Sequence, residues 1–423
     1  MNNHKNQWLI IFCLVYAGEM IFSLPFHIPR FFRPTVLDVF DLNNAELGDI
    51  FAVYGILAML AYFPGGVIAD HFSARKLMVT SLVATSLGGL YLAQIPGGIG
   101  LSLLFGYWGL TSILLFWAAM IKVTREWGGT DKQGIAFGIL DGGRGLVAAC
   151  AASIAVWIFS LVLPAHIETL THLQQQQAIE SVIYFYTVMT LVAALFIWWI
   201  IPEAGSDRNA ARVRAFTGIT VVLRQRVVWL QAVIIICAYS GYKGLDYYAL
   251  YARDALAMNE IESAQFTTIA AYLRPVAAIA TGFIVDRYIA SRVIVFFFIV
   301  LFSSYIILSF TSPPSYGINL IYINIIITFI AVYGIRGVYF ALIEETKIAS
   351  NVTGTAVGLI SVIGFTPDIF FAPIAGRILD ASPGVTGLQN YFLMLSGFAI
   401  IGMLASLMLA RFKPGRLALN DVS

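Results

Sequence analysis

The chain has 423 residues, of which 59% are hydrophobic and only 11% are charged. A soluble protein has roughly 25% charged residues on average, so this composition excludes an ordinary soluble globule and indicates a protein surrounded by lipid. The formal net charge of +2 provides no field that would attract nucleic acid, which excludes nucleic-acid binding as a function class.

Apolar windows of about 20 residues, each long enough to cross a bilayer as a helix, recur along the whole chain. The first window has no small-residue cleavage site and continues into Pro25 and Pro29, which favours a helix over a signal peptide. The sequence therefore predicts an all-α integral membrane protein. We predict twelve transmembrane helices, at residues 8–29, 47–69, 77–95, 99–122, 133–161, 181–201, 227–251, 264–285, 290–310, 318–343, 353–378 and 390–411.

A polar, arginine-rich segment at 202–226 divides the chain into an N-terminal half, 1–201, and a C-terminal half, 227–423, with six predicted helices each. Lysine and arginine residues concentrate in this segment and in every second loop, whereas the opposite side holds only Arg30, Arg33, Arg253 and Arg377. Basic residues accumulate in cytoplasmic loops. We therefore expect both termini in the cytoplasm and a multi-pass protein of the inner (plasma) membrane.

One loop pattern occurs twice, about half the chain apart. After the second predicted helix it contains Gly66, Asp70, Arg75 and Lys76, and after the eighth it contains Gly282, Asp286, Arg287 and Arg292. Repetition on this scale is typical of two six-helix repeats in a membrane transporter. The first copy resembles the signature loop of the major facilitator superfamily, G-x-x-x-D-[R/K]-x-G-[R/K]-[R/K], although His71, Ser73 and Ala74 depart from it.

The resemblance to this superfamily covers the whole chain through the span count, the central segment and the repeated loop. It implies two six-helix halves related by pseudo-two-fold symmetry, transport by alternating access around a site between them, and a cytoplasmic gate formed by the repeated loop. It also implies a monomer in the lipid bilayer that binds a small-molecule substrate and needs no cofactor. Within the superfamily the resemblance is closest to the organophosphate-antiporter-like branch.

Several charged residues lie deep within the predicted spans, where each costs at least about 2.5–3.5 kcal/mol. They fall on predicted helices one, five, seven, eight, ten and eleven, and none falls on helices three, six, nine or twelve, which the resemblance places at the periphery. This distribution predicts an aqueous central pathway. The residues are Glu19, Asp141, Arg144, Lys243, Asp246, Arg274, Arg336 and Asp368.

Arginine side chains suit the forked recognition of carboxylate or phosphate, so the buried basic residues predict an anionic organic solute. Asp141 and Arg144 are three residues apart, as are Lys243 and Asp246, and each pair can either neutralise itself or contact the substrate. We expect substrate binding by Arg144, Lys243, Asp246, Arg274, Arg336, Asp141, Tyr16, Tyr247 and Tyr272.

Glu19 and Asp368 are the candidates for proton coupling, because neither has an opposite charge one helical turn away. The alternative for Glu19 is a permanent bond to a basic residue of another helix. Prolines next to Arg274 and Asp368, at positions 275 and 367, each remove a backbone donor and can open the helix locally.

Other functions fit less well. A proton-coupled drug or metabolite exporter is the main alternative, but the segment from Gly138 to Gly145 lacks the proline of the corresponding exporter motif. An intramembrane enzyme is disfavoured because the chain has no HExxH motif and no matched serine nucleophile, and the absence of an ATP-binding loop indicates energy from a gradient. We predict no catalytic residue and no metal site. A receptor of the same fold that does not transport remains open.

Overall fold

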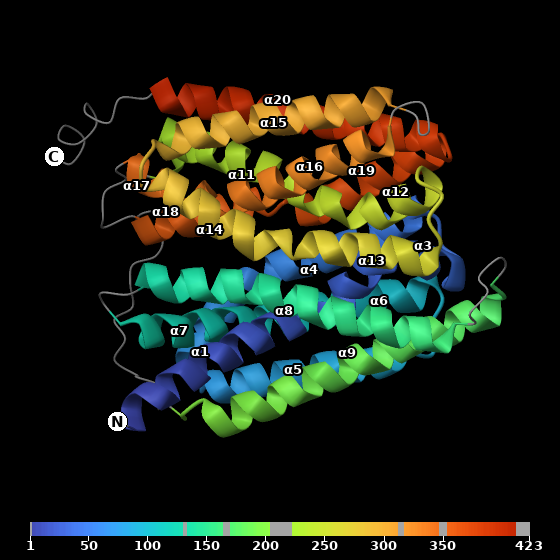
Figure 1. Cartoon of the computed structure of the whole chain (residues 1–423). Coiled ribbons are helices and arrows are strands. Elements are labelled where there is room, and N and C mark those ends of the chain that lie inside the picture. Colours follow the sequence, from blue (N-terminus) through green and yellow to red (C-terminus); the bar gives the residue numbers. More distant parts are fainter. Residues whose placement is uncertain are drawn as a thin grey trace. The chain divides into compact units, whose positions relative to one another are not determined.

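The computed structural model describes residues 2–129, 133–163, 170–203, 222–311, 317–346 and 353–411. Within these ranges every regular element is a helix and no β-strand occurs (Figure 1). Most of the predicted central segment, together with the basic positions Lys132, Lys347, Lys413 and Arg416, lies outside the described residues.

The first six predicted spans are present as helices, several of them in more than one piece. The first consists of α1 and α2 joined by the π-helix η1, and the fourth contains a second π-helix, η2. A short extra helix, α3, follows the first span. The bounds are α1 Asn2–Met20, η1 Ser23–His27, α2 Ile28–Phe31, α3 Arg33–Val39, α4 Asn44–His71, α5 Ala74–Leu92, α6 Gly98–Leu110, η2 Thr111–Trp117, α7 Ala118–Gly128, α8 Gln133–Val162 and α9 His172–Ile200.

The last six predicted spans are also helical, and four of them are interrupted. The bounds are α11 Arg226–Gly244, the 3-10 helix η3 Leu245–Tyr247, α12 Tyr248–Asp254, α13 Glu260–Ala271, α14 Leu273–Val285, α15 Ala290–Phe310, α16 Ile318–Val338, the 3-10 helix η4 Tyr339–Ala341, α17 Leu342–Glu345, α18 Thr353–Gly364, α19 Pro367–Ala381 and α20 Val385–Arg411.

Ten helical segments among the described residues are long and apolar enough to cross a membrane, and the bent first span, with 45° between its two parts, makes eleven. The segment that fails this criterion is α5, which begins with Arg75 and Lys76 and is rich in small polar residues. These residues are satisfied inside the protein: the Ser81 hydroxyl donates to the Thr111 carbonyl oxygen over 2.6 Å, and the Thr85 and Thr111 hydroxyls lie 2.8 Å apart. The predicted span at 77–95 is thus a helix whose polar groups bond to its neighbour.

Two of the interruptions coincide with the prolines noted in the sequence. The helix that carries Arg274 is interrupted at Tyr272, between α13 and α14. The helix that carries Asp368 is interrupted between α18 and α19, and Pro367 opens the first turn of α19, where its missing N–H costs least.

The chain forms two compact units. The first comprises residues 1–210, 246–275 and 368–380, and the second comprises 211–245, 276–367 and 381–423. In the first unit α4 packs on α6, α5 on α9, and α1 on α8; in the second, α20 packs on α15 and α11. The division into six-helix halves at 202–226 remains a prediction.

Candidate functional site

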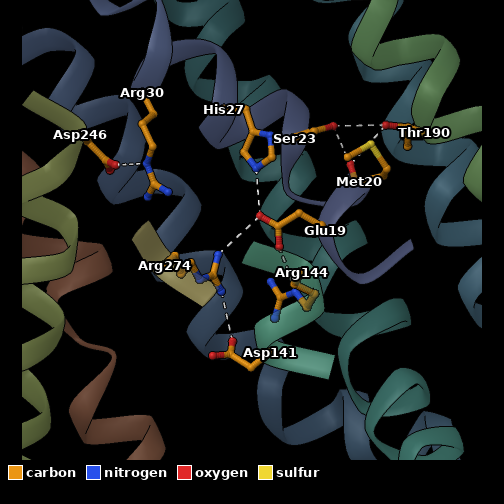
Figure 2. Close-up of polar contacts among 10 residues, drawn as sticks. All are labelled: Glu19, Met20, Ser23, His27, Arg30, Asp141, Arg144, Thr190, Asp246 and Arg274. Carbon is orange, nitrogen blue, oxygen red and sulfur yellow. Dashed lines mark hydrogen bonds and ion pairs between the residues drawn. The ribbon is translucent and has the colours of Figure 1, made fainter. Parts of the chain in front are cut away.

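A buried carboxylate, Glu19, lies at the centre of a polar cluster in the first unit (Figure 2). It stands in the last turn of α1, just before the chain bends into η1. His27 Nε2 lies 3.0 Å from its Oε1, Arg144 Nε lies 3.0 Å from its Oε2, and Arg274 Nη1 lies 3.8 Å from Oε1. One carboxylate therefore faces two guanidinium groups, from α8 and α14, and an imidazole from η1.

The cluster also contains a second carboxylate, Asp141. Its Oδ1 lies 3.1 Å from Arg274 Nη2, so Arg274 stands between Asp141 and Glu19 (Figure 2). A glycine makes room for this arrangement, because a Cβ atom at Gly145 would lie 2.8 Å from Cδ of Arg274. We call Glu19, His27, Asp141, Arg144 and Arg274 the Glu19 cluster.

The charges of the Glu19 cluster balance when His27 is neutral, with two carboxylates against two guanidinium groups. The side chains of Glu19, Arg144 and Arg274 are 5%, 10% and 6% exposed, whereas that of Asp141 is 43% exposed. Charges buried to this extent are tolerated only when they are paired. An anion that entered the cluster would therefore have to displace a carboxylate or bring a compensating positive charge.

The sequence left open whether Asp141 and Arg144 neutralise one another within α8. In the structure each has an ion partner on another helix, Arg274 for Asp141 and Glu19 for Arg144. Glu19 itself contacts basic groups from other helical segments, namely His27, Arg144 and Arg274.

Asp246 pairs with Arg30, whose Nε donates to its Oδ1 (Figure 2). Arg30 and Arg33, which the sequence analysis counts among the residues between the first two spans, lie in helices, because the first span continues to Phe31 and α3 follows at once. Arg33 is fully buried: its Nη2 donates to Asn44 Oδ1 over 3.1 Å, and its guanidinium lies 3.9 Å from the Tyr247 ring centre.

The polarity of the acidic residues after the first span suggests a solvated surface patch, but two of them form ion pairs. Asp38 Oδ2 accepts from Arg253 Nη1 over 3.2 Å. The Asp49 carboxylate accepts hydrogen bonds from both terminal nitrogens of Arg377, over 2.9 and 3.1 Å. Two acidic residues before the central segment are thus paired with arginines that follow it, within the first unit.

The same unit brings α4 and α19 into backbone contact. Asp380 accepts hydrogen bonds from the backbone nitrogens of Asn44 and Ala45, over 3.2 and 2.7 Å, and so satisfies the first turn of α4. A Cβ atom at Gly376 would lie 2.3 Å from the Asn44 carbonyl oxygen, and one at Gly48 would lie 2.4 Å from that of Ala372. Only glycine permits so close an approach.

The other predicted ligands have varied surroundings. Lys243 on α11 is buried, and the Arg336 guanidinium on α16 lies 3.8 Å from the Tyr242 ring centre; both belong to the second unit. Asp368 is half-buried at the start of α19, in the first unit.

The three predicted tyrosines use their hydroxyl groups within the first unit. The Tyr16 hydroxyl donates to the Met189 carbonyl oxygen over 3.2 Å, and that of Tyr247 donates to the Ala372 carbonyl oxygen over 3.4 Å. Tyr272 is 38% exposed, and its hydroxyl lies 2.9 Å from that of Ser153. Of the predicted substrate and coupling residues, the structure thus gathers Glu19 and three others, Asp141, Arg144 and Arg274, in one cluster.

The first copy of the repeated loop is anchored to the end of α9. Lys76 Nζ lies 2.6 Å from Glu203 Oε1, and Arg75 pairs with the other oxygen. The hydrogen bond from Lys76 holds the pKa of the Glu203 carboxyl below its usual value, and the nearby charges of Lys76 and Arg75 act in the same direction. Asp70 is exposed and forms no hydrogen bond or ion pair with the described part of the chain.

The rest of the repeated pattern is open to its surroundings. Asp286, Arg287 and Arg292 of the second copy are exposed. Gly66 and Gly282 are half-buried, and a Cβ atom added to either glycine would meet no described neighbour within 4 Å. The described ranges contain no group of three or more His, Cys, Asp or Glu residues that could hold a metal ion.

Two residues in or beside the Glu19 cluster, His27 and Trp117, were not predicted from the sequence. His27 lies eight residues after Glu19, which is about 12 Å further along a regular helix, and the bend of the first span into η1 brings its imidazole to the carboxylate. Trp117, whose ring centre lies 5.7 Å from the Arg144 guanidinium, looked like one more aromatic residue of a membrane helix. The apolar residues that surround Arg30 and Arg33, among them Phe31 and Phe32, were the available signal that the first span extends further.

Comparison with known proteins agrees with this architecture. The inner membrane protein YihN of Escherichia coli strain K12 is 26% identical over 429 residues, which cover 96% of each chain. The nitrite extrusion protein of Bacillus subtilis strain 168 is 23% identical over 384 residues, 85% of this chain and 84% of that protein. A mutant of the nucleoside transporter NupG has the same fold, with a TM-score of 0.75 at 12% identity, over 96% of this chain and 100% of that one.

The sequence also matches a family profile, that of the Major Facilitator Superfamily, over residues 8–366. This match spans most of the chain, and it agrees with the all-α membrane fold and with the resemblance seen in the repeated loop. The protein belongs to the Major Facilitator Superfamily of secondary transporters.

Proposed function

We propose that this transporter moves a small organic anion across the inner membrane by alternating access. The observation that carries the proposal is the convergence of two buried guanidinium groups, Arg144 and Arg274, on the single carboxylate of Glu19. Arginine presents a planar fork that matches carboxylate and phosphate groups. A substrate anion can replace Glu19 as the partner of these arginines. An organophosphate, an organic acid and a carboxylate siderophore all have the required chemistry.

Charge balance in the Glu19 cluster predicts coupling to protons. The two guanidinium groups favour the charged form of Glu19, so the carboxylate gains a proton only when an anionic substrate draws an arginine away. Binding of one monovalent anion together with one proton leaves the net charge of the cluster unchanged. This balance favours anion–proton symport, with Glu19 or its neighbour His27 as the proton acceptor.

Other predicted residues enter the proposal in supporting roles. Lys243 and Arg336 are candidate anion ligands of the second unit, and Asp368 is a second candidate for proton coupling. We propose that the pairs Asp38–Arg253 and Asp49–Arg377 form an outer gate, closed in this state, because they join segments on either side of the central segment. The repeated loop is the proposed cytoplasmic gate, with both termini in the cytoplasm.

Export of the anion is a second candidate for the direction of transport. The observation that favours it is the similarity to a nitrite extrusion protein, whose name describes the removal of an inorganic anion. The Glu19 cluster serves export equally well, because a carrier that alternates between two states works in the direction set by its gradients.

The first experiment is a thermal-shift screen of the purified protein with organophosphates, di- and tricarboxylates, siderophores and sugars, because specific binding raises apparent stability. The affinity of any anion that binds is then measured for Arg144→Lys and Arg144→Ala. We expect Arg144→Lys to weaken the affinity and Arg144→Ala to weaken it further. Unaltered affinity in both variants would remove the basis of the anion proposal.

Coupling is tested in proteoliposomes with an imposed pH gradient. We expect the gradient to drive uptake by the wild type and by Glu126→Gln, a matched control at an exposed glutamate of α7. Glu19→Gln should lose the response to the gradient but still exchange substrate. If its response matched that of the control, proton coupling through Glu19 would be refuted.

A further inference from the structure

Two aromatic rings flank the guanidinium of Arg144. Its Cζ atom lies 5.4 Å from the ring centre of Phe22 and 5.7 Å from that of Trp117. The two rings meet nearly edge to face, with centres 6.0 Å apart and planes at 65°. Arg144 is buried, whereas both rings are partly exposed, so part of their surface can contact another molecule.

A buried aromatic layer supports these rings. Phe26, also partly exposed, lies next to Phe22 with ring centres 6.3 Å apart. Behind it, Tyr54 meets Phe26 edge to face at 4.8 Å, and Phe51 lies parallel to it at 5.8 Å. Tyr54 and Phe51 are 3% and 4% exposed. The layer is thus held in place by packed rings, and its front consists of Phe22, Phe26 and Trp117, which we call the aromatic wall.

The backbone presents the aromatic wall through two π-helical segments. Phe22 immediately precedes η1, and Trp117 is the last residue of η2. A π-turn holds one residue more than an α-turn and therefore rotates the side chains that follow it around the helix axis. Such turns are rare and occur frequently at functional sites. Here η1 contains Phe26 and η2 contains Trp117, so each π-helical segment places one ring of the aromatic wall.

We propose that the aromatic wall binds a ring of the substrate while Arg144 binds its negative charge. The transported anion then belongs to the ring-bearing organic acids, with either an aromatic ring or a sugar ring. Ring faces stack on tryptophan and phenylalanine, and an adjacent arginine fixes the orientation of the acid group. This inference rests on the anion transport proposed above and adds the substrate class to it.

The competing explanation is that the rings only shield Arg144 from its surroundings. Pairs of ligands distinguish the two explanations when both members have the same charge and a similar size but only one member contains a ring. Shielding predicts equal affinity within a pair. Stacking predicts a preference for the cyclic member of about tenfold, which is the usual strength of one aromatic contact.

The experiment measures the affinity of the full-length protein in detergent for two such pairs by isothermal titration calorimetry. Glucuronate is compared with open-chain gluconate, and benzoate is compared with hexanoate. We expect the wild type to prefer the cyclic member of at least one pair by about tenfold, and the identity of that pair distinguishes a sugar acid from an aromatic acid. Trp117→Ala should abolish the preference, whereas Trp199→Ala, at a tryptophan that is 81% exposed, should retain it.

The outcomes separate this inference from the proposed function. If cyclic and open-chain acids bind equally and Arg144→Ala weakens both, the anion proposal stands and the aromatic wall is overturned. If no acid of either kind binds while a neutral solute does, both are overturned. Should Trp117→Ala fail to fold, Phe22→Leu replaces it, and the wild-type comparison alone still decides between stacking and shielding. A preference that survives both substitutions places the ring elsewhere and refutes the inference.

Discussion

Removal of the negative charge from Glu19 should destabilise the protein, and a second, compensating substitution should restore part of the loss. In Glu19→Gln the guanidinium groups of Arg144 and Arg274 lose their shared partner, whose oxygens lie 3.0 and 3.8 Å away. The Glu19 cluster then carries an excess positive charge. In the double variant Glu19→Gln/Arg144→Gln the numbers of positive and negative charges are equal again.

The magnitude follows from the distances and the burial. Two unit charges 4 Å apart attract by about 4 kcal/mol at an effective dielectric constant of 20. Breaking a buried pair by removing one partner costs about 3–5 kcal/mol, because the other charge is left without compensation. We expect Glu19→Gln and Arg144→Gln each to lower the unfolding free energy by this amount, and the double variant to lose less than either single variant.

The assay is a double-mutant cycle on four proteins in one detergent, with unfolding followed by tryptophan fluorescence. The cluster geometry predicts a coupling energy of about 3 kcal/mol or more between positions 19 and 144. Matched substitutions at the exposed Glu126 should show no coupling with Arg144. Additive losses at positions 19 and 144 would refute the charge-balance reasoning, since they would mean that the two groups do not compensate one another.

Three further predictions concern the rest of the first unit and its loops. Gly376→Ala should destabilise the protein by about 1–3 kcal/mol, as measured by the melting temperature, because its Cβ would overlap the backbone of α4. The same change at Gly397 in α20, where an added Cβ would meet no described neighbour within 4 Å, should cause no loss of stability. Asp380→Ala should cost about 1 kcal/mol in the same measurement, since the backbone N–H groups of Asn44 and Ala45 in the first turn of α4 lose their acceptor, and an unchanged melting temperature would contradict this role. The lowered pKa of Glu203 means that its bond to Lys76 stabilises the fold above the unfolded-state pKa of about 4.3 and that this contribution is lost as the pH falls through the folded-state pKa. The difference in melting temperature between wild type and Glu203→Gln should therefore be present at about pH 6 and shrink as the pH falls below about 4.3, and a difference that does not change with acidification would exclude this cause.

The sequence predicted the helices because lipid imposes a strong constraint on composition. Spans such as 290–310 coincide with a helix of the structure, α15, residue for residue. Agreement is poorer where polar residues continue a helix. The predicted span 181–201 begins after the polar run Gln174 to Gln177, but α9 already begins at His172, because Thr171 and Gln174 form a capping box that satisfies its first turn.

Part of the candidate site was also predictable, because buried charges are expensive and stand out in apolar segments. Glu19, Asp141, Arg144 and Arg274 were all identified this way. Their partners were not, since local spacing allowed a bond between Asp141 and Arg144 and gave no information on contacts between helices. His27 was missed for a related reason: a π-helix changes the periodicity on which such reasoning depends.

The interrupted helices also explain why segments of the last six spans belong to the first unit. The unit boundaries at 245/246, 275/276 and 367/368 each lie within four residues of an interruption, at η3, at Tyr272 and between α18 and α19. At an interruption the ladder of backbone hydrogen bonds is broken, so bending there costs less than within a continuous helix. The chain passes from one unit to the other where bending of the helix costs the least free energy. Asp246, Arg274 and Asp368 lie beside these points.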